Sequence, residues 1–327
     1  MKAYSNQNVL VTGGLGFIGS NLALRLAELG AQVTVIDPCI PGCGGNPANL
    51  HGSPFPIHVV PCDIGAPDLP TALLRDADVV FNLAGEVSHM ASIQEPERDL
   101  AINTVAQLRF LQRLAHHHPG VRVVFAGTRQ VYGVPDYLPV DESHPIHPVD
   151  FNGVHKYAAT MYHHMLSNSG QLDACVLRLT NVYGPHLSLH TPGQGVLAAF
   201  LRKLSLGERL EILGDGRQLR DPVYVDDVVD AFLLAGAAAT LPSRSYNIGG
   251  PQALELRQIA ILASELAGVD APVYREFSAE QKSIDIGSYW ADFSRIQREL
   301  GWSPATPFAA GIVKSLDHYR IRMAAHA

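Results

Sequence analysis

Four glycines and one carboxylate near the start of the chain have the residue types and spacing of a nucleotide-binding site. The glycines are Gly13, Gly14, Gly16 and Gly19. Because they add almost no side-chain bulk, backbone N–H groups in this stretch can approach a pyrophosphate closely. Asp37 follows about 20 residues later, where a carboxylate can accept both hydroxyl groups of an adenosine ribose. A carboxylate there repels a 2′-phosphate, so the pattern predicts NAD rather than NADP as the cofactor.

The flanking segments have the pattern needed to position these residues. Val9 to Val11 form a short apolar run bounded by glycine, which predicts a buried parallel strand. Apolar residues then recur at helical spacing over 17–29, and the positive end of that helix would face the phosphates. Gly30 ends the helix, and 31–36 predict the second strand, with Asp37 at its end. Strand, glycine turn, helix, strand and acid therefore form one dinucleotide-binding unit.

Composition excludes several classes of function. The chain has 327 residues and a net charge of −7, and its basic residues are dispersed, which argues against a nucleic-acid surface. No apolar run approaches the ~20 residues of a membrane span, and Met1 to Gln7 lack the apolar stretch of a signal peptide. The four cysteines and the histidines show no paired metal-ligand spacing, so we expect reduced thiols and no metal. We therefore expect a cytoplasmic enzyme with no membrane or nucleic-acid partner.

Predicted strands and helices alternate along the first half of the chain, which is typical of a doubly wound parallel sheet. Further strands are predicted over 57–62, 78–83, 121–126 and 174–179, and helices over 97–117 and 151–169. The later helices are predicted near 193–206, 226–239, 255–267 and 308–323. We predict an α/β Rossmann domain over 1–180, to which parts of 220–250 return, and a smaller α/β substrate lobe over 181–327. Ligands of such sheets bind at the carboxyl ends of the strands.

Short motifs at those strand ends resemble one known family. They are TGGLGFIG at 12–19, DI at 63–64, NLAG at 82–85, Asn103, TRQVYG at 128–133, Lys156, RLTNVYGP at 178–185, RDPVYVDD at 220–227, YNIG at 246–249 and LGW at 300–302. Together they resemble the extended short-chain dehydrogenase/reductase family, the nucleotide-sugar epimerases and dehydratases. The resemblance covers essentially the whole chain. It implies a bound NAD, a nucleotide-diphosphate sugar as substrate and a homodimer built on the helices near 97–117 and 151–169.

The resemblance also assigns expected roles to individual residues. Asp63 and Ile64 would border the adenine, and Lys156 would hold the nicotinamide ribose. The expected cofactor contacts are Gly13, Gly16, Phe17, Ile18, Gly19, Asp37, Asp63, Ile64, Leu83, Ala84, Gly85, Asn103 and Lys156. Thr128 stands where the family hydrogen-bonds the sugar hydroxyl that is oxidised. The expected substrate contacts are Glu86, Ser88, Arg129, Asn181 and Arg220.

The tyrosine that the family places four residues before the lysine is missing. Oxidation of a hydroxyl needs a base for its proton, and in the family a tyrosine beside an ammonium supplies it. Here Asn152 stands four residues before Lys156, and no lysine of the chain follows a tyrosine at this spacing. An asparagine amide cannot take a proton near neutral pH. Asn152 is therefore expected either to position a hydroxyl or to cap a helix that starts near Gly153.

Another group must then supply the base, and the sequence leaves several candidates. We rank Lys156 first, Tyr132 second and Glu86 third. Burial lowers the pKa of a lysine readily, although holding the cofactor competes with that role. Ser88 and His89 follow the same strand as Glu86, at the mouth of the predicted cleft. His155 should point to a different helix face from Lys156 and is expected to be an ordinary packed or solvated histidine.

A second departure from the family bears on the type of reaction. Family dehydratases carry an Asp-Glu pair directly after the threonine, because elimination of water needs an acid and a base. Here the pair is Arg129-Gln130, which supplies neither at pH 7. Arg129 is expected either to bind a substrate carboxylate or phosphate or to form an interior salt bridge. We therefore predict an epimerase, with a net oxidoreductase or unusual dehydratase, and a non-catalytic NAD-dependent binding protein, as the alternatives.

Overall fold

A computed structural model describes residues 3–191, 193–277 and 286–324 of the chain. Its centre is a seven-stranded sheet in the order β11-β6-β5-β4-β1-β2-β3, and every neighbouring pair is parallel. The strands are β1 (Asn8–Thr12), β2 (Gln32–Ile36), β3 (Ile57–Val60), β4 (Val79–Asn82), β5 (Arg122–Thr128), β6 (Asp173–Leu179) and β11 (Ser245–Ile248). The predicted α/β doubly wound sheet is therefore confirmed.

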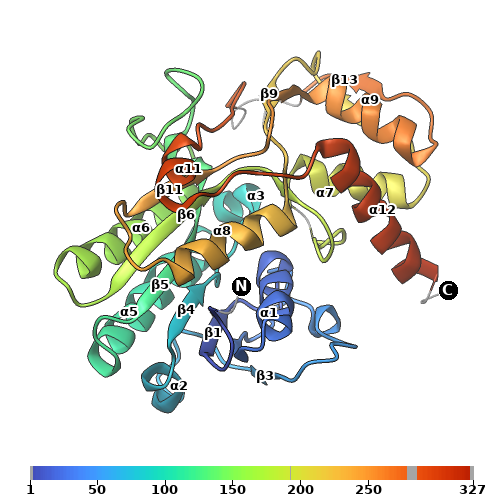
Figure 1. The fold of residues 1–327 in the computed structure, drawn as a ribbon. Helices are drawn as coiled ribbons and strands as arrows, with labels where there is room; N and C mark the ends of the chain where they lie inside the picture. The colour runs from blue at the N-terminus through green and yellow to red at the C-terminus, as the bar shows by residue number, and fades with distance from the viewer. Residues whose placement is uncertain (1–2, 192, 278–285, 325–327) are drawn as a thin grey trace.

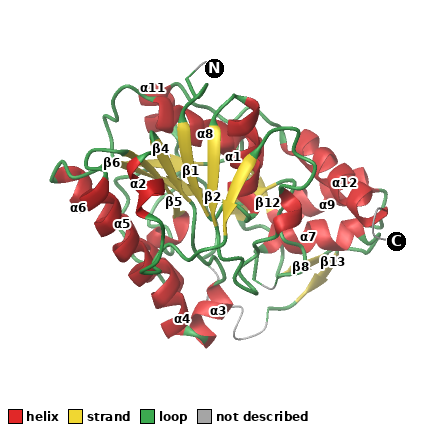
Figure 2. Cartoon of the chain, turned by 90° about the horizontal axis from the view of Figure 1, so that it is seen from below, coloured by secondary structure: helices red, strands yellow, loops and turns green. Residues whose placement is uncertain are grey.

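Helices cover both faces of this sheet (Figure 2). They are α1 (Phe17–Glu28), α2 (Thr71–Arg75), α3 (His89–Gln94), α4 (Pro96–Leu100), α5 (Ala106–His117), α6 (Phe151–Asn168) and α8 (Val225–Ala237). Alternate residues of β1 face opposite layers. Val9 and Val11 pack in the cluster that contains Leu22 of α1 and Phe232 of α8, whereas Leu10 packs in the cluster with Phe110 of α5. This alternation holds the end of β1 between the two helical layers.

The smaller, C-terminal part packs three helices around its own core. They are α7 (Val196–Ser205), α9 (Leu256–Ala267) and α12 (Phe308–Ala324), which Figure 1 shows side by side near the C-terminus. Leu201, Ile259 and Leu316, one from each helix, lie in one buried cluster. The short strands form three further pairs: β7 (Val182–Tyr183) with β10 (Val223–Tyr224), β8 (Glu211–Leu213) with β13 (Val273–Arg275), and β9 (Leu219–Arg220) with β12 (Leu254–Glu255).

The predicted helix over 97–117 contains a change of helical form. Between α4 and α5 the residues Ala101–Val105 form a π-helical turn, with Asn103 and Thr104 buried in it. Such turns inside α-helices are frequent at functional sites. Periodicity alone did not show this turn, because one extra residue barely disturbs the apolar pattern of a helix of this length.

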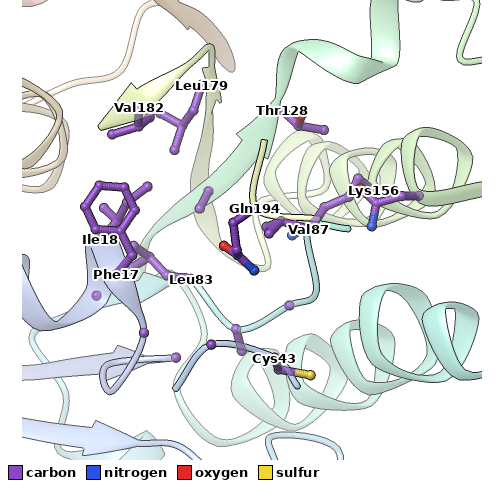
Figure 3. Close-up of a pocket in the computed structure, with 18 of the residues that line it drawn as sticks. Phe17, Ile18, Cys43, Leu83, Val87, Thr128, Lys156, Leu179, Val182 and Gln194 are labelled. Carbon is purple, nitrogen blue, oxygen red and sulfur yellow. The ribbon is translucent and has the colours of Figure 1, made fainter. Parts of the chain in front are cut away.

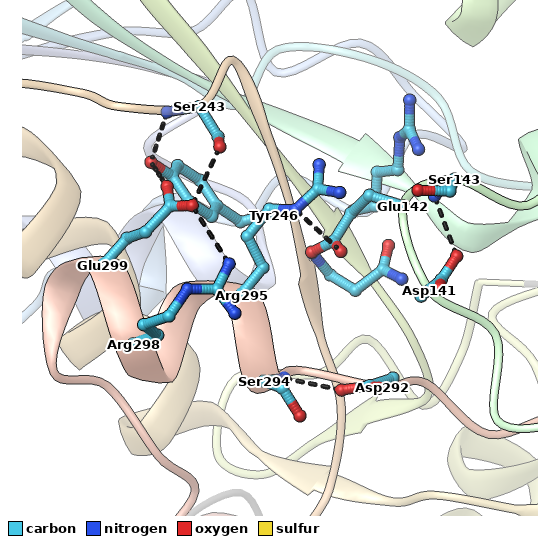
Figure 4. Close-up of polar contacts among 12 residues, drawn as sticks. Asp141, Glu142, Ser143, Ser243, Tyr246, Asp292, Ser294, Arg295, Arg298 and Glu299 are labelled. Carbon is cyan, nitrogen blue, oxygen red and sulfur yellow. Dashed lines mark hydrogen bonds and ion pairs between the residues drawn. The ribbon is translucent and has the colours of Figure 1, made fainter.

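A polar network holds the last short helix, α11 (Ser294–Leu300), against the sheet (Figure 4). The Tyr246 hydroxyl of β11 donates to Glu299 at 3.0 Å, and Arg295 pairs with Glu142 at 3.3 Å. Glu142 also accepts the backbone N–H of Asn247. These contacts fix the course of the chain that leads from the smaller part back to the sheet. Over the described residues, no helix is both long enough and apolar enough to span a membrane.

Candidate active site

A cavity of about 440 Å³ lies at the carboxyl ends of the central strands. Its lining comes from the segments that follow β1, β2, β4, β5 and β6, and from α6. In Figure 3, Phe17 and Ile18 lie at one side of it and Thr128 and Lys156 at the other. The smaller part of the chain closes the cavity with the loop that includes Gln194 and with Arg220. The site therefore lies where parallel α/β sheets bind their ligands.

The glycine turn after β1 is packed too tightly for side chains. A Cβ atom on Gly13 would lie 2.7 Å from the Leu83 carbonyl oxygen, and one on Gly19 would lie 2.2 Å from the Gly13 carbonyl oxygen. Gly13 also has a φ of +68°, which favours glycine. Helix α1 starts directly after Gly16, and no side chain caps its first N–H groups. The turn thus forms a bare, positively polarised cradle of the kind that binds a pyrophosphate.

Asp37 and Asp63 shape the adjoining end of the cavity. The Asp37 carboxylate accepts the backbone N–H groups of Leu15 at 3.0 Å and Cys39 at 2.8 Å. Burial raises the pKa of Asp37, although these two hydrogen bonds oppose the rise. Asp63 accepts the N–H of Gly65 at 2.7 Å and lines the cavity beside Ile64, as the family resemblance implies for an adenine neighbour. These residues fit the adenosine half of NAD.

Lys156 and Thr128 lie toward the other end of the cavity. Lys156 comes from α6 and is 5% exposed, and burial lowers the pKa of its ammonium to about 8, although Asp99 and Glu86 raise it. A Cβ on Gly85 would lie 2.5 Å from the Lys156 Nζ, so the ammonium closes over the backbone at Gly85. Thr128 ends β5, and its hydroxyl accepts the Gln130 N–H at 3.2 Å. Leu83 and Ala84 complete this wall.

The structure gives Asn152 a different role from a helix cap. Helix α6 starts at Phe151, and Asp150 is the cap, since its carboxylate accepts the Gly153 N–H at 2.7 Å. Of the two roles left open for Asn152, the helix cap is therefore wrong. Its buried side-chain nitrogen instead donates to the Glu86 carbonyl oxygen at 3.0 Å and to Asp99 at 2.8 Å. Asn152 lines the cavity and ties α6 to the segment that follows β4.

Asp99 holds a second residue of α6 as well. His155 contacts the other Asp99 oxygen at 2.7 Å through its Nδ1. The imidazole is buried and paired, and His155 is not among the described residues that line the cavity. The expectation of an ordinary packed histidine thus agrees with this position.

Two proposed bases lie outside the lining that the described residues form. Tyr132 is 0% exposed, and its hydroxyl lies between Arg178, at 2.6 Å, and Asn247, at 2.7 Å. Burial raises its pKa, although Arg178 opposes this, so Tyr132 is poorly suited to act as a base. Glu86 is also buried, and its carboxylate lies 3.6 Å from Arg98. Both side chains are thus engaged by other protein groups, and their predicted contacts with the substrate stay predictions.

Ser88 and Asn103 hold backbone groups beside the cavity. The Ser88 hydroxyl accepts the Ala91 N–H at 3.1 Å and so caps α3. The Asn103 side-chain oxygen accepts the Glu86 N–H at 3.0 Å from the π-helical turn. Neither is among the described residues that line the cavity. The Asn103 side-chain nitrogen has no hydrogen-bond partner among the described residues, so the cofactor contact at Asn103 and the substrate contact at Ser88 stay predictions.

Two arginines and an asparagine line the substrate side of the cavity. The Arg129 guanidinium lies 4.9 Å above the Tyr289 ring, and among the described residues no carboxylate is within salt-bridge distance of it. The interior salt bridge that the sequence left open is thus not formed. Arg220 donates to the carbonyl oxygens of Leu219 and Gly287. The Asn181 side-chain oxygen is buried without a hydrogen-bond partner in the part of the chain that the structure describes.

The structure also brings together a group that the sequence reasoning did not assemble. His89, the first residue of α3, lines the cavity, with its Nδ1 on the Asp150 carboxylate and its Nε2 on the side-chain amide of Gln130. The sequence marked His89 only as lying at the mouth of the cleft. Its partners are 61 and 41 residues away, so spacing gives no signal for them. The one signal in the sequence that could have pointed to this cluster was Asp150, an acid directly before the helix that carries Lys156.

Comparisons with known proteins agree with this geometry. The model of the NAD dependent epimerase/dehydratase family matches residues 9–249. The chain belongs to this family. It is 35% identical over 318 residues to a UDP-glucose 4-epimerase of Mycolicibacterium smegmatis, covering 95% of this chain and 98% of that relative.

Solved structures of other proteins share the fold of this family member over nearly its whole length. A UDP-glucose 4-epimerase of Thermotoga maritima with UDP-glucose has a TM-score of 0.85 and 30% identity, covering 97% of this chain and 100% of that chain. MoeE5 in complex with UDP-glucose and NAD has a TM-score of 0.83 and 28% identity, covering 97% and 99%. Membership of the family accounts for the cofactor cradle. It leaves the group that replaces the tyrosine to be found in this chain.

Proposed function

We propose that this protein is an NAD-dependent epimerase of nucleotide sugars that acts on UDP-hexoses at carbon 4. The observation that carries the proposal is one cavity in which a glycine cradle for a dinucleotide adjoins Thr128, Lys156 and two arginines. When bound, NAD supplies an acceptor and then a donor of hydride. The preference for uridine diphosphate and for carbon 4 is supported by the names of the relatives described above.

Each lining residue has a proposed role in holding the reactants. Thr128 hydrogen-bonds the sugar hydroxyl that is oxidised, and Lys156 holds the nicotinamide ribose. Asn181 and Arg220 bind the nucleotide and its diphosphate, and the unpartnered Asn181 oxygen suits an N–H donor on a uracil ring. These contacts keep the reacting carbon in place while it is a ketone, so that hydride can return to its other face. The proposed division into a cofactor part, 1–180, and a substrate part, 181–327, follows from these roles.

Arg129 is proposed to bind an anionic group of the substrate. Its guanidinium lies in the cavity wall, and burial lowers its pKa, which means that the charge is poorly solvated there. The Tyr289 ring supports it from one side at 4.9 Å. A buried cation with this arrangement gains strongly from a bidentate phosphate or carboxylate partner.

The alternative activities predict other products. A dehydratase needs an acid and a base directly after Thr128, and Arg129 and Gln130 supply neither. A net oxidoreductase would release reduced cofactor. A non-catalytic NAD-binding protein could use Lys156 to hold the cofactor, but it would have no use for Thr128 beside it in the same cavity. Epimerisation is therefore the activity that this site supports best.

One assay separates these activities. The purified protein is tested for bound NAD and then incubated with a panel of nucleotide sugars, with the Lys156→Met variant, prepared in parallel, as the control for contaminating enzymes. We expect an isomer to form without net reduced cofactor. Stoichiometric reduced cofactor would instead establish an oxidoreductase, loss of water a dehydratase, and binding without turnover a non-catalytic protein.

A homodimer through α6 and its neighbours is part of the proposal. Val154 and Met165 on α6 are exposed, Met165 by 62%, and Leu100 is exposed at the end of α4, a helix that contacts α6. Large apolar side chains on adjacent helices are typical of a helical dimer interface. Light scattering should give twice the chain mass, and Met165→Glu should shift the protein toward the monomer. A monomeric wild type would exclude this interface.

We also propose a cytoplasmic location. All four cysteines are free thiols, as is usual for a reducing compartment. Cell fractionation with an antibody to the protein tests this, and recovery in a secreted or membrane fraction would contradict it.

A further inference from the structure

We infer that His89, oriented by Asp150, is the general base and acid that replaces the missing tyrosine. This inference rests on the proposed epimerase function and adds the group that moves the hydroxyl proton. It starts from an imidazole that lines the same cavity as Thr128 and Lys156. The remaining steps concern how the imidazole is held, which of its nitrogens faces the substrate, and why other groups do not fit.

Asp150 fixes the orientation of the imidazole. One oxygen of its carboxylate accepts the Gly153 N–H at 2.7 Å and is thereby fixed at the start of α6, and the other contacts His89 Nδ1. The Asp150 side chain is 2% exposed, whereas that of His89 is 33% exposed. A carboxylate only accepts hydrogen bonds, so Nδ1 carries the proton and Nε2 keeps its lone pair. A histidine with a buried carboxylate behind it has the arrangement of a general base.

The charge on Asp150 supports this arrangement. Burial raises the pKa of Asp150, but the hydrogen bond and charge of His89, the Gly153 N–H and Arg129 together hold it below its ordinary value. The carboxylate is therefore present at neutral pH. It can stabilise an imidazolium that forms when His89 accepts a proton.

Gln130 connects His89 to the residue that holds the reacting hydroxyl. Its side-chain nitrogen faces His89 Nε2, and its backbone N–H donates to the Thr128 hydroxyl at 3.2 Å. The Gln130 side-chain oxygen is buried and has no hydrogen-bond partner among the described residues. A sugar hydroxyl placed here can donate to Nε2 in place of the amide. The vacant acceptor on Gln130 then suits a second hydroxyl of the sugar.

The position also matches the gap left by the absent tyrosine. Asp150 precedes Asn152 by two residues, and both Asn152 and Lys156 line the cavity that His89 enters. His89 thus reaches the reacting end beside the first turn of α6, from the segment that follows β4 instead of from α6 itself. Lys156 thus stays on α6, as in the family, whereas the proposed proton acceptor comes from the start of α3.

The other titratable groups near this end fit the role less well. Burial lowers the pKa of Lys156 only to about 8, so at pH 7 it remains mostly a cation that has no lone pair. Tyr132 is enclosed by Arg178 and Asn247. Glu86 faces Arg98 outside the lining formed by described residues. Of these candidates, His89 combines a lining position with a lone pair at Nε2, on which the Gln130 amide lies in this structure.

The proton that leaves the sugar hydroxyl in the first half of the reaction returns to it in the second half. As the carbinol carbon is oxidised to a ketone, its hydrogen leaves as hydride to NAD, and the hydroxyl proton moves to His89 Nε2. The O–H bond breaks, an N–H bond forms, and Asp150 stabilises the resulting imidazolium. When the ketone is reduced on its other face, the imidazolium returns the same proton to the oxygen. No oxidant or base is consumed.

The test compares variants of the full-length protein in the isomerisation assay. We expect His89→Gln to lower kcat by about 10²–10⁴-fold, the usual contribution of a positioned acid or base, with KM and bound NAD within about twofold of wild type. His116→Gln is the matched control, because His116 is exposed at the end of α5. Its kcat should equal that of wild type.

Chemical rescue separates proton transfer from a structural role. Added imidazole should raise the kcat of His89→Gly at least tenfold. It should leave the kcat of wild type and of His116→Gln unchanged. Asp150→Asn, which can stabilise the wrong tautomer, should lower kcat with little change in KM. His89→Gln with the kcat of wild type, or His89→Gly without rescue, overturns the role of His89. A wild type that isomerises no nucleotide sugar contradicts the proposed function instead.

Discussion

The two ends of the cavity are built in different ways. At the cofactor end, 30 consecutive residues, 8–37, supply a turn whose function depends on the absence of side chains. At the reaction end, His89, Gln130 and Asp150 come from three separate segments and meet through their side chains. A backbone cradle tolerates almost no substitution. A side-chain cluster can exchange its proton acceptor while the scaffold stays unchanged, as the presence of Asn152 four residues before Lys156 illustrates.

The largest effect should come from adding one methyl group to the cradle. A Cβ on Gly19 would lie 2.2 Å from the Gly13 carbonyl oxygen, and backbone cannot move aside as a flexible side chain does. We expect Gly19→Ala to lose bound NAD and about 3 kcal/mol or more of stability, at the upper end of overpacking effects. Thermal unfolding and the NAD content of the purified protein measure this.

Gly16→Ala is a milder change in the same turn and serves as the comparison for Gly19→Ala. Its Cβ would lie 3.2 Å from the same oxygen, so a small shift relieves the contact. It should retain part of the bound NAD. If both variants bind NAD as wild type does, the cofactor end does not depend on a bare backbone.

The second effect concerns the buried ammonium at the reaction end. Since the pKa of Lys156 falls from 10.5 to about 8 on folding, its charge destabilises the folded protein wherever both states are protonated, below pH 8. Lys156→Met should therefore stabilise the NAD-free protein at pH 7, by at most about 3 kcal/mol, while it abolishes turnover. The gain should shrink as the pH rises from 8 to 10.5, because the folded lysine loses its proton in this range and its buried charge disappears, whereas the unfolded lysine keeps its proton up to about pH 10.5.

Denaturant titrations of both proteins at several pH values check this. The difference between the two curves removes the contribution of other titrating groups. A gain that grows between pH 8 and pH 10.5 would show that Lys156 is not held in a charge-destabilised state.

A third effect tests whether Arg129 binds the substrate. We expect Arg129→Met to weaken nucleotide-sugar binding by about 10–100-fold, the usual range for a hydrogen bond to a charged group, without change in bound NAD. Arg129→Lys keeps the charge and should lose less. Isothermal titration with the uridine diphosphate sugar measures both. Equal affinity of wild type and Arg129→Met for the nucleotide sugar would show that Arg129 does not bind the substrate and only stacks on Tyr289.

The smallest effect is expected at Asp37, whose charge discriminates between cofactors. Asp37→Asn keeps an oxygen for one backbone N–H but removes the repulsion of a 2′-phosphate. The ratio of NAD to NADP affinity should fall by about tenfold, or about 1.4 kcal/mol. Competition between the two cofactors measures the ratio, and nucleotide-sugar affinity serves as the control. An unchanged ratio would assign cofactor choice to another residue.

Much of the fold was predictable because the signals are local. Runs of buried residues bounded by glycine predicted β1 and β2, and apolar spacing predicted α1 and α6 to within about one residue of their ends. A helix start expected near Gly153 was one reason why a cap was among the two roles left open for Asn152. Asp150, three residues before Gly153, was a better cap by type and position, but no pattern separates a cap from a lining residue two positions later.

The sequence by itself determined the dinucleotide cradle, the α/β class of the sheet and the loss of the tyrosine, because each follows from residue types and spacing over short stretches of chain. Only the tertiary structure decided which side chains line the cavity beside Thr128 and Lys156. It buried Tyr132 between Arg178 and Asn247 and brought His89 to Asp150 across 61 residues of chain. The physical reason is that backbone sterics act locally, whereas the partners of a side chain depend on how distant segments pack.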